Sequence, residues 1–487
     1  MAETLKDRTT KGLFWGGLSN VVLQGVGLVF GIILGRLLSP YDYGMTAMIL
    51  VFQLLATALQ ESGFKSAIGN LKEPQHRDYN SVFWFNILMG AACYVVLFCC
   101  APLIARYYHT PELVPLCRYA FLNVIFASLG TAQSAYLFRN LKVKEQAKAG
   151  MAAILLSNIV GAIMAWLGCG YWSLATQSIL YIALNSAMLW YYSPWRPSFD
   201  IDFRPVRQMF KFSSKLLITT ILDRINMNIM NVLLGRYFST VDVGHYNQAY
   251  MWSSKASYIV QGTTNPVVQP VMTNVADEQE RQLRIFRKLV RFTAFVCFPM
   301  LFGLGLISRE FITLALTEKW LRSAELLQIL CVSGAFLPIS NVLSNLIVSK
   351  GRSGTFFWCT FTLSMTLIVA MMLSHGLGIR TMAVIYVAIY MVWVFVWHQL
   401  VRRLIGYTLW MFLTDMLPFA LTALAVMVVT GYVTVGITSQ WLLLTTRIVL
   451  AALLYSLVMI VARVQIMQDC IDFVFQKFHK KTDATVA

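Results

Sequence analysis

Charged side chains are scarce in this sequence. Asp, Glu, Lys and Arg make up 13% of the 487 residues, whereas soluble domains usually carry about 25%. Hydrophobic residues reach 58%, and the mean hydropathy is +0.64. This composition excludes an ordinary soluble domain and indicates a polytopic membrane protein.

Several motifs that would indicate an enzyme are also absent. The nine cysteines form no C-x-x-C pair, so neither a disulfide framework nor a metal site is predicted. No G-x-x-x-x-G-K-[ST] loop is present, so ATP is not the expected direct energy source, and no cofactor is expected. Asp200 and Asp202 have the spacing of a glycosyltransferase metal pair, but we interpret them as a solvated loop pair. Sizeable outer loops that could hold a catalytic domain are missing too, so we expect no enzyme.

Long apolar runs divide the chain into about fourteen segments that could cross a membrane, each near the roughly 20 residues that a spanning helix needs. No small-residue cleavage site follows the first run, so we expect it to be retained. The segments lie near 13–36, 43–66, 80–104, 114–138, 149–168, 171–193, 213–236, 243–269, 290–308, 324–348, 354–374, 381–401, 411–435 and 441–463.

The basic residues predict the orientation of these segments. Most of the 39 Lys and Arg residues fall in alternate loops, which predicts that both termini lie in the cytoplasm. The net charge of +17 is explained by attraction of these short loops to anionic lipid headgroups, so membrane lipids are expected partners and nucleic acid is not. Residues 274–291 are predicted to form a cytoplasmic surface helix.

A ten-residue motif occurs twice, as GRLLSPYDYG and GRYFSTVDVG, with the frame Gly-Arg-x-x-Ser-x-x-Asp-x-Gly. Each copy closes one apolar segment and opens the next, as expected of an internal repeat in a transporter. An even number of segments separates the copies, so the two halves should be related by a pseudo-two-fold axis along the membrane normal. The residues of the repeat are Gly35, Arg36, Ser39, Asp42, Gly44, Gly235, Arg236, Ser239, Asp242 and Gly244.

We favour a structural role for this motif over a role in substrate binding. The glycine can end a helix, Ser or Asp can cap the next one, and the arginine can extend to the outer interface. The predicted fold is all-α, with two six-helix lobes and two further carboxy-terminal helices. Its parts are the lobe 1–195, the cytoplasmic linker 196–212, the lobe 213–403, the helices 404–463 and an amphipathic cytoplasmic tail 464–487.

Polar residues in segment 213–236 predict the functional site. Arg224 lies about twelve residues from the start of this segment, roughly 17 Å along a helix and near the membrane midplane. Asn228 and Asn231 follow it at i+4 and i+7 and form a stripe with it. Asp223 is its neighbour. A charge at this depth is costly and must face water or a partner.

Two other segments carry polar residues at similar depth. Asn20 and Gln24 lie in the first segment, and Gln24 takes the repeat position of Arg224. The segment 243–269 holds Lys255, together with His245, Gln248 and Trp252. One interpretation is a buried ion pair between Asp223 and Lys255. We favour a hydrated cationic cavity, in which Arg224 and Lys255 bind phosphate and the amides and Trp252 contact sugars.

Six stretches resemble the polysaccharide exporter, or Wzx-type flippase, family, and within it the colanic acid exporter group. They are TLKDRTTKGLFW (4–15), LSPYDYGMTAMILVF (38–52), ESGFKSAI (61–68), VFWFN (82–86), RPSFDIDFRPVRQMFKFSSKLL (196–217) and TEKWLRSAELLQILC (317–331). The resemblance implies the multidrug/oligosaccharidyl-lipid/polysaccharide superfamily fold and alternating access. It also implies that the protein moves undecaprenyl-diphosphate-linked oligosaccharide across the inner membrane. In the similar lipid II flippase the two extra helices form a groove for the lipid tail, so 404–463 is a candidate groove.

The resemblance leaves the coupling and the partners as expectations. A proton or sodium ion or the membrane potential would drive the cycle, with Asp223 and His245 as candidate coupling groups, and polysaccharide assembly proteins are candidate partners. The main alternative is a drug/cation antiporter on the same fold, which would offer a carboxylate-lined cavity. A membrane polymerase or transferase is the other alternative.

Overall fold

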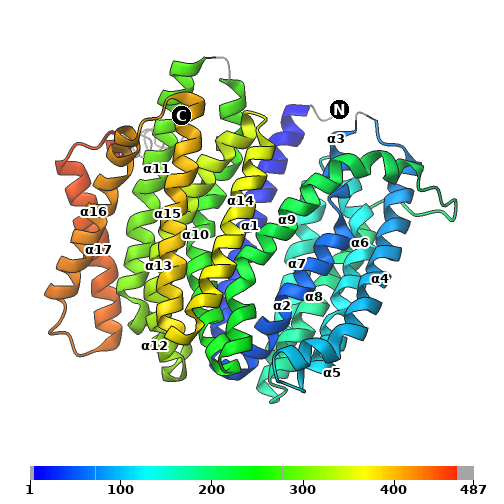
Figure 1. The fold of residues 1–487 in the computed structure, drawn as a ribbon, viewed down its shortest axis with the longest axis horizontal. Helices are drawn as coiled ribbons and strands as arrows, with labels where there is room; N and C mark the ends of the chain where they lie inside the picture. Colours follow the sequence, from blue (N-terminus) through cyan, green and yellow to red (C-terminus); the bar gives the residue numbers. More distant parts are fainter. Residues whose placement is uncertain (1–4, 72, 276–277, 469–487) are drawn as a thin grey trace, which may run out of the picture. The chain divides into compact units, whose positions relative to one another are not determined.

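The computed structural model describes residues 5–71, 73–275 and 278–468. In these residues all regular secondary structure is helical, with no β-strand (Figure 1). It divides into two compact units, Met1–Asn247 and Gln248–Ala487. The predicted tail 464–487 falls mostly outside the described residues.

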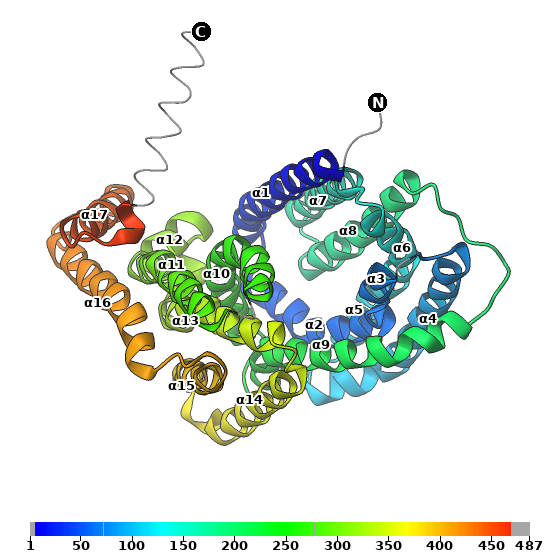
Figure 2. The same cartoon turned by 90° about the horizontal axis from the view of Figure 1, so that it is seen from above.

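The first unit is built from nine helices and the start of a tenth. α1 packs against α7, α7 against α8, α4 against α6, and α9 against α2 and α4; the pairing of α1 with α7 is visible in Figure 2. The helices are α1 Leu5–Leu37, α2 Pro40–Glu61, α3 Phe64–Asn70, α4 His76–Tyr107, α5 Leu113–Ala120, α6 Leu122–Arg139, α7 Val143–Trp166, α8 Tyr171–Tyr192, α9 Arg204–Tyr237 and α10 Thr240–Asn274.

The second unit contains the rest of α10 and seven further α-helices. α13 packs against α11 and α15, and α16 packs against α11 and α17. The helices are α11 Gln279–Leu306, α12 Ser308–Leu316, α13 Leu321–Ser349, α14 Ser353–Ser374, α15 Ile379–Ile405, α16 Leu409–Val433 and α17 Gln440–Val461, with short 3₁₀ turns at Glu318–Trp320 and His375–Leu377.

Every predicted apolar segment falls on one or more of these helices. Eleven spans in the described residues are long and apolar enough to cross a membrane. α8, α9 and α10 are not among them, and α9 and α10 carry most of the polar residues singled out above. The all-helical fold is therefore confirmed, whereas the count of fourteen crossings stays a prediction.

The segment 114–138 is divided between α5 and α6, with a break at Phe121. The side-chain amide of Gln53 on α2 donates to the carbonyl of Ala120 at this break, over 3.4 Å. Arg118 lies with its guanidinium 4.4 Å from the centroid of the Phe98 ring. A cation–π contact thus accommodates the Arg118 charge within this predicted apolar segment.

The predicted surface helix 274–291 is not a separate element. α11 runs without interruption from Gln279 to Leu306, so its basic first half and its apolar second half form one continuous helix. The first half of α11 packs against the protein through one face, because Gln282, Phe286 and Val290 are buried. This packing explains why the helix continues without a break. Helical spacing puts these three on one side and leaves basic residues on the other.

The loop between α8 and α9, residues 193–203, is a strap fixed to the start of α4. The Asn80 side chain donates to the Asp200 carbonyl over 2.6 Å and accepts from the Ser198 backbone N–H over 2.9 Å. Trp84 donates from its indole N–H to the Ser198 carbonyl over 2.7 Å. Trp195 is buried in the apolar core beneath.

The interpretation of Asp200 and Asp202 as a solvated loop pair is wrong for Asp202. Its carboxylate pairs with Arg77 on α4, and it also accepts from the backbone N–H of Arg204 over 2.9 Å at the start of α9. The sequence could not show this contact because Arg77 and Asp202 lie far apart in the chain. Asp202 therefore ties α4 to the first turn of α9.

Candidate functional site

The repeated motif places matching capping residues at the starts of α2 and α10. Ser39 is the N-cap of α2, and its backbone N–H donates to the Asp42 carboxylate over 2.8 Å, which completes a capping box. In the second copy the Ser239 hydroxyl donates to Asp242 over 2.7 Å, and the Asp242 N–H donates back over 3.2 Å. Both copies thus satisfy backbone groups that a helix start leaves open.

The last glycines of the two copies form a reciprocal contact. A Cβ atom on Gly44 would overlap the carbonyl oxygen of Thr240, and a Cβ atom on Gly244 would overlap the carbonyl oxygen of Pro40. Pro40 and Thr240 hold the same place in the two copies. The first turns of α2 and α10 therefore cross backbone against backbone, which only glycine permits. We call this crossing the glycine joint.

The arginines of the motif differ between the copies, whereas the first glycines behave alike. α1 continues past Gly35 to Leu37 and α9 past Gly235 to Tyr237, so neither glycine ends its helix. Arg36 is exposed. Arg236 instead donates to the carbonyl of Tyr107 at the end of α4 over 2.7 Å. Gly235 packs so closely on Tyr108 and Met48 that a side chain would collide with both.

Arg224 is exposed in the middle of α9, roughly 30 Å from the start of the helix and about 20 Å from its end. The rest of the predicted stripe is not exposed: Asn228 is 6% and Asn231 1% accessible. The Asn228 amide donates to the Arg224 carbonyl over 2.9 Å. These two asparagines thus do not line an open surface in this structure, while Arg224 does, and its neighbour Asp223 is half-buried.

Asn20 and Gln24 are both exposed on α1. α1 is apolar around them, and little of its span is buried. Side-chain amides facing hydrocarbon would lack hydrogen-bond partners, so this stripe requires a hydrated or polar surrounding. α1 packs on α7 whereas α9 packs on α2 and α4, so the repeat-equivalent Gln24 and Arg224 have different neighbouring helices.

The polar residues of α10 are more enclosed. His245 is 5%, Gln248 1% and Trp252 5% accessible. The Lys255 ammonium lies 4.7 Å from the centroid of the Trp252 ring, and the same ring packs edge-on against Phe311 at 5.0 Å. Trp252 is thus occupied by Lys255 and Phe311, and in this structure it offers no free face to a sugar.

A charged cluster that the sequence interpretation missed lies between α11 and α16. The Arg287 guanidinium holds the Asp415 carboxylate through two hydrogen bonds of 2.8 Å, and Arg291 adds one of 2.5 Å. Tyr407 donates to the same carboxylate over 3.0 Å, and burial, reinforced by Asp415, raises the pKa of this phenol. The signal was Asp415 itself, an acidic residue within a predicted apolar segment.

A groove of about 260 Å³ opens beside this cluster. Arg291 lies in its wall, and the rest comes mainly from α16, α17 and the residues after α17, among them Phe419, Met459 and Ile466. Nearby apolar walls and one cation suit an amphiphilic ligand with a negative group. This groove lies among the helices of residues 404–463, where the resemblance predicts a lipid-tail groove.

Residues 33–325 match the profile of the family described as "Polysaccharide biosynthesis protein". The chain belongs to this family. Three curated relatives agree with the assignment. The lipopolysaccharide biosynthesis protein WzxC of Escherichia coli K12 is 26% identical over 72% of this chain and 71% of its own length.

The other two relatives are more distant but cover similar shares. The teichuronic acid biosynthesis protein TuaB of Bacillus subtilis is 24% identical over 81% of this chain and 80% of its own length. The succinoglycan biosynthesis transport protein ExoT of Rhizobium meliloti is 24% identical over 74% of this chain and 73% of its own length.

Two solved structures establish the fold of this family member. The lipid II flippase MurJ in an inward closed conformation has a TM-score of 0.77 at 16% identity and covers 93% of this chain and all of its own. A multidrug resistance MATE transporter in an inward-facing conformation has a TM-score of 0.63 at 15% identity and covers 79% of this chain and 94% of its own. The chain is therefore a multi-pass membrane protein with the fold of the superfamily predicted from the sequence.

Proposed function

We propose that this protein is a flippase that moves undecaprenyl-diphosphate-linked oligosaccharide from the cytoplasmic to the outer leaflet of the bacterial inner membrane for polysaccharide biosynthesis. The observation that carries the proposal is Arg224, an exposed guanidinium halfway along α9 in a member of this family. A cation at that depth is costly, so it is expected where an anionic group has to be received.

The guanidinium suits phosphate because its planar donors form two parallel charge-assisted hydrogen bonds to phosphate oxygens. Lys255 is proposed as a second phosphate-binding cation, released from its contact with Trp252 when substrate binds. Asn20 and Gln24, exposed on α1, provide donors and acceptors for sugar hydroxyls.

The glycine joint supports a rocking motion. Backbone against backbone contact brings two helix starts together without side chains between them, so a small rotation there displaces few atoms. We propose this joint as the pivot of alternating access.

Two further roles belong to the proposal. Asp223 and His245 are proposed to bind the coupling proton or sodium ion. The groove beside Arg291 is proposed to hold the prenyl tail.

The experiment is export in cells that lack their own exporter of this glycan. Such cells should accumulate a lipid-linked oligosaccharide, and this chain should restore the polysaccharide at the surface. Arg224→Ala and Lys255→Ala, tested separately, should each reduce export roughly 10–100-fold, the loss expected for one charge-assisted hydrogen bond or two.

The control is Arg403→Ala, which removes an exposed arginine in the last turn of α15. It should export normally, and all three variants should insert into the membrane in equal amounts. Normal export by both Arg224→Ala and Lys255→Ala would refute the cationic headgroup site. Failure of the unaltered chain with every lipid-linked glycan offered would refute the flippase itself.

A further inference from the structure

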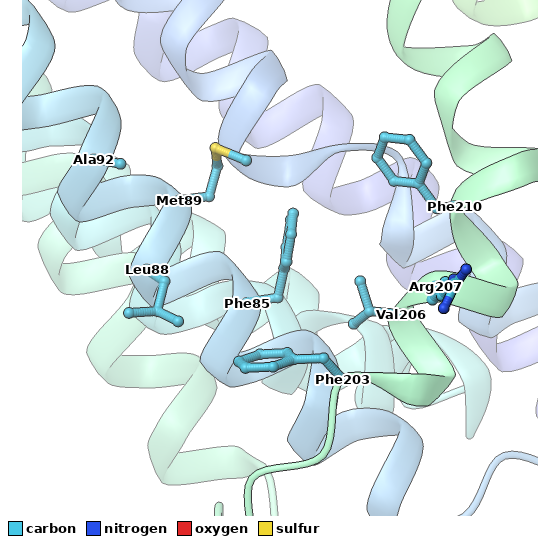
Figure 3. A pocket seen from close by; sticks show the side chains of 8 residues that line it. All are labelled: Phe85, Leu88, Met89, Ala92, Phe203, Val206, Arg207 and Phe210. Carbon is cyan, nitrogen blue, oxygen red and sulfur yellow. The ribbon is translucent and has the colours of Figure 1, made fainter.

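A second groove lies on the first unit, between α4 and the beginning of α9. It has a volume of about 550 Å³ and a lining that is almost wholly apolar. Figure 3 shows Leu88, Met89 and Ala92 on one wall and Phe203 and Phe210 on the other. Leu88 is 56% and Phe210 47% exposed, so the groove is open to its surroundings.

The strap gives this groove its shape before any ligand enters. Phe203 is the last residue before α9, and Asp202, directly before it, is held by Arg77 of α4 and by the Arg204 backbone. The Asn80 amide fixes the strap two residues earlier, at Asp200. The wall formed by Phe203 and α9 is therefore anchored to the start of α4, the helix that forms the other wall.

One cation lies in the wall of the groove. Arg207, one turn into α9, is exposed and lines the groove next to Val206. The other arginines of this region, Arg77 and Arg204, pair with Asp202. In the part of the chain that the structure describes, the Arg207 guanidinium has no ion-pair partner. The groove thus combines an apolar channel with one uncompensated positive charge.

We propose that this groove binds an anionic phospholipid of the bilayer, with an acyl chain between α4 and α9 and its phosphate on Arg207. α4 is a candidate span with little of its surface buried, so the groove faces lipid directly. Basic pockets beside spanning helices bind anionic headgroups in this manner. A single guanidinium matches the single charge of a phosphodiester better than the higher charge of a prenyl diphosphate.

The bound lipid would hold the strap, α4 and α9 together. Its phosphate offsets the charge on Arg207 at the first turn of the helix that carries Arg224. The site is independent of the proposed flippase activity, because it lies on the lipid-facing surface of α4 and requires no transported glycan.

The test uses the full chain, purified in neutral detergent and examined by native mass spectrometry with added phosphatidylglycerol or phosphatidylcholine. The unaltered chain should retain phosphatidylglycerol over phosphatidylcholine. Arg207→Gln should reduce that preference about fivefold, the effect of one basic residue near an anionic lipid surface, and Arg207→Lys should keep most of it. Arg403→Gln should behave like the unaltered chain.

Ala92→Trp tests the channel separately from the charge. Ala92 lines the groove and is exposed, whereas its exposed neighbour Ala91 does not line it. Ala92→Trp should block retention of the lipid and Ala91→Trp should not, with both variants eluting as monodisperse folded protein.

Three outcomes would overturn the proposal. They are unchanged preference in Arg207→Gln, equal retention of the two phospholipids by the unaltered chain, and displacement of phosphatidylglycerol by an equimolar amount of undecaprenyl diphosphate. The last result would assign the groove to a prenyl lipid. Export by Arg207→Gln, measured in parallel, separates failure of this site from failure of the flippase.

Discussion

Single charges carry most of the functional information in this protein. Insertion of an arginine at the centre of a spanning helix costs roughly 2.5–3.5 kcal/mol, and Arg224 lies near the middle of α9, which we predict to cross the membrane. A residue that contributed only packing would avoid this cost by being apolar. The exposure of Arg224 is therefore best explained by binding of a polar or anionic group, which is the basis of the proposed headgroup site.

Asp415, unlike Arg224, is a charged residue whose partners belong to the protein itself. Its side chain is fully buried, while Arg287 and Arg291 are 28% and 43% exposed. Removing the carboxylate leaves two guanidinium groups without their shared partner, although both can partly turn to solvent. We therefore expect the cluster to stabilise the packing of α16 on α11.

Asp415→Ala should lower the free energy of unfolding by about 3 kcal/mol, the lower end of the range for breaking a buried ion pair. Thermal unfolding of the purified protein in detergent measures the effect. Thr414→Ala, on the preceding residue, is the control, because its hydroxyl bonds only to its own helix. Equal melting temperatures for the two variants would contradict a stabilising role of the cluster.

At the scale of elements, the structure of the strap differs from what its sequence indicates. Its polar composition indicated a solvated linker, yet Trp195 is buried and Asn80 bonds to it twice. Side-chain amides that satisfy a loop backbone turn that loop into a fixed element. The strap thereby sets where α9 begins.

Asn80→Ala should release the strap from α4. The Asp200 carbonyl and the Ser198 N–H lose their partner, at a cost of about 1–3 kcal/mol for each polar group that stays buried. Limited proteolysis should then cut within residues 193–203 several times faster than in the unaltered chain. Asn140→Ala is the matched control, since that amide bonds only to its own helix; equal cleavage of both variants would show that Asn80 does not hold the strap.

The glycine joint is a second device at this scale. Gly44→Ala and Gly244→Ala should each force α2 and α10 apart, with a loss of about 3 kcal/mol in stability, because the added carbon meets a backbone oxygen that cannot turn away. Export should fall in parallel if the joint is the pivot.

Gly150→Ala on α7 is the control for the joint. A Cβ atom there meets nothing within 4 Å, so the substitution should leave stability unchanged or raise it by up to about 1 kcal/mol. Melting temperature and surface polysaccharide are measured together. Normal values for both joint variants would exclude a structural constraint at the crossing.

At the scale of the whole molecule, the sign of the transported charge separates the flippase from an antiporter on the same fold. Proteoliposomes that contain the purified chain should move a fluorescent lipid-linked oligosaccharide diphosphate between leaflets and should not accumulate cationic dyes. Arg224→Ala proteoliposomes are the control for spontaneous lipid movement. Accumulation of cationic dyes without lipid movement would favour the antiporter.

The fold class and the family could be predicted from the sequence alone. Apolar runs of spanning length need no distant partners to be recognised, and the family profile at 33–325 confirms the resemblance carried by the short motifs. The limits of the two lobes, 1–195 and 213–403, stay a prediction. The compact units divide at Asn247, because α9 packs on α2 and α4 and the start of α10 crosses α2 at the glycine joint.

The site was predictable only in part. Depth along a helix follows from counting residues, so Arg224 could be placed near the middle of α9. Which side of the helix is covered depends on neighbours that the sequence does not identify. Asn228, Asn231, Gln248 and Trp252 are buried in this structure, and their place in the lining of a cavity stays a prediction.

The sequence by itself determined what each segment is: an apolar helix of spanning length, a polar stripe, a capped helix start. These properties depend on residues within a few turns of one another. Only the tertiary structure decided which segments meet, since the contacts of Arg77 with Asp202, of Arg287 with Asp415, and of Gly44 with Thr240 join residues far apart in the chain. The groove at Arg207 was likewise decided by the tertiary structure, because its walls come from two helices whose spacing the strap sets.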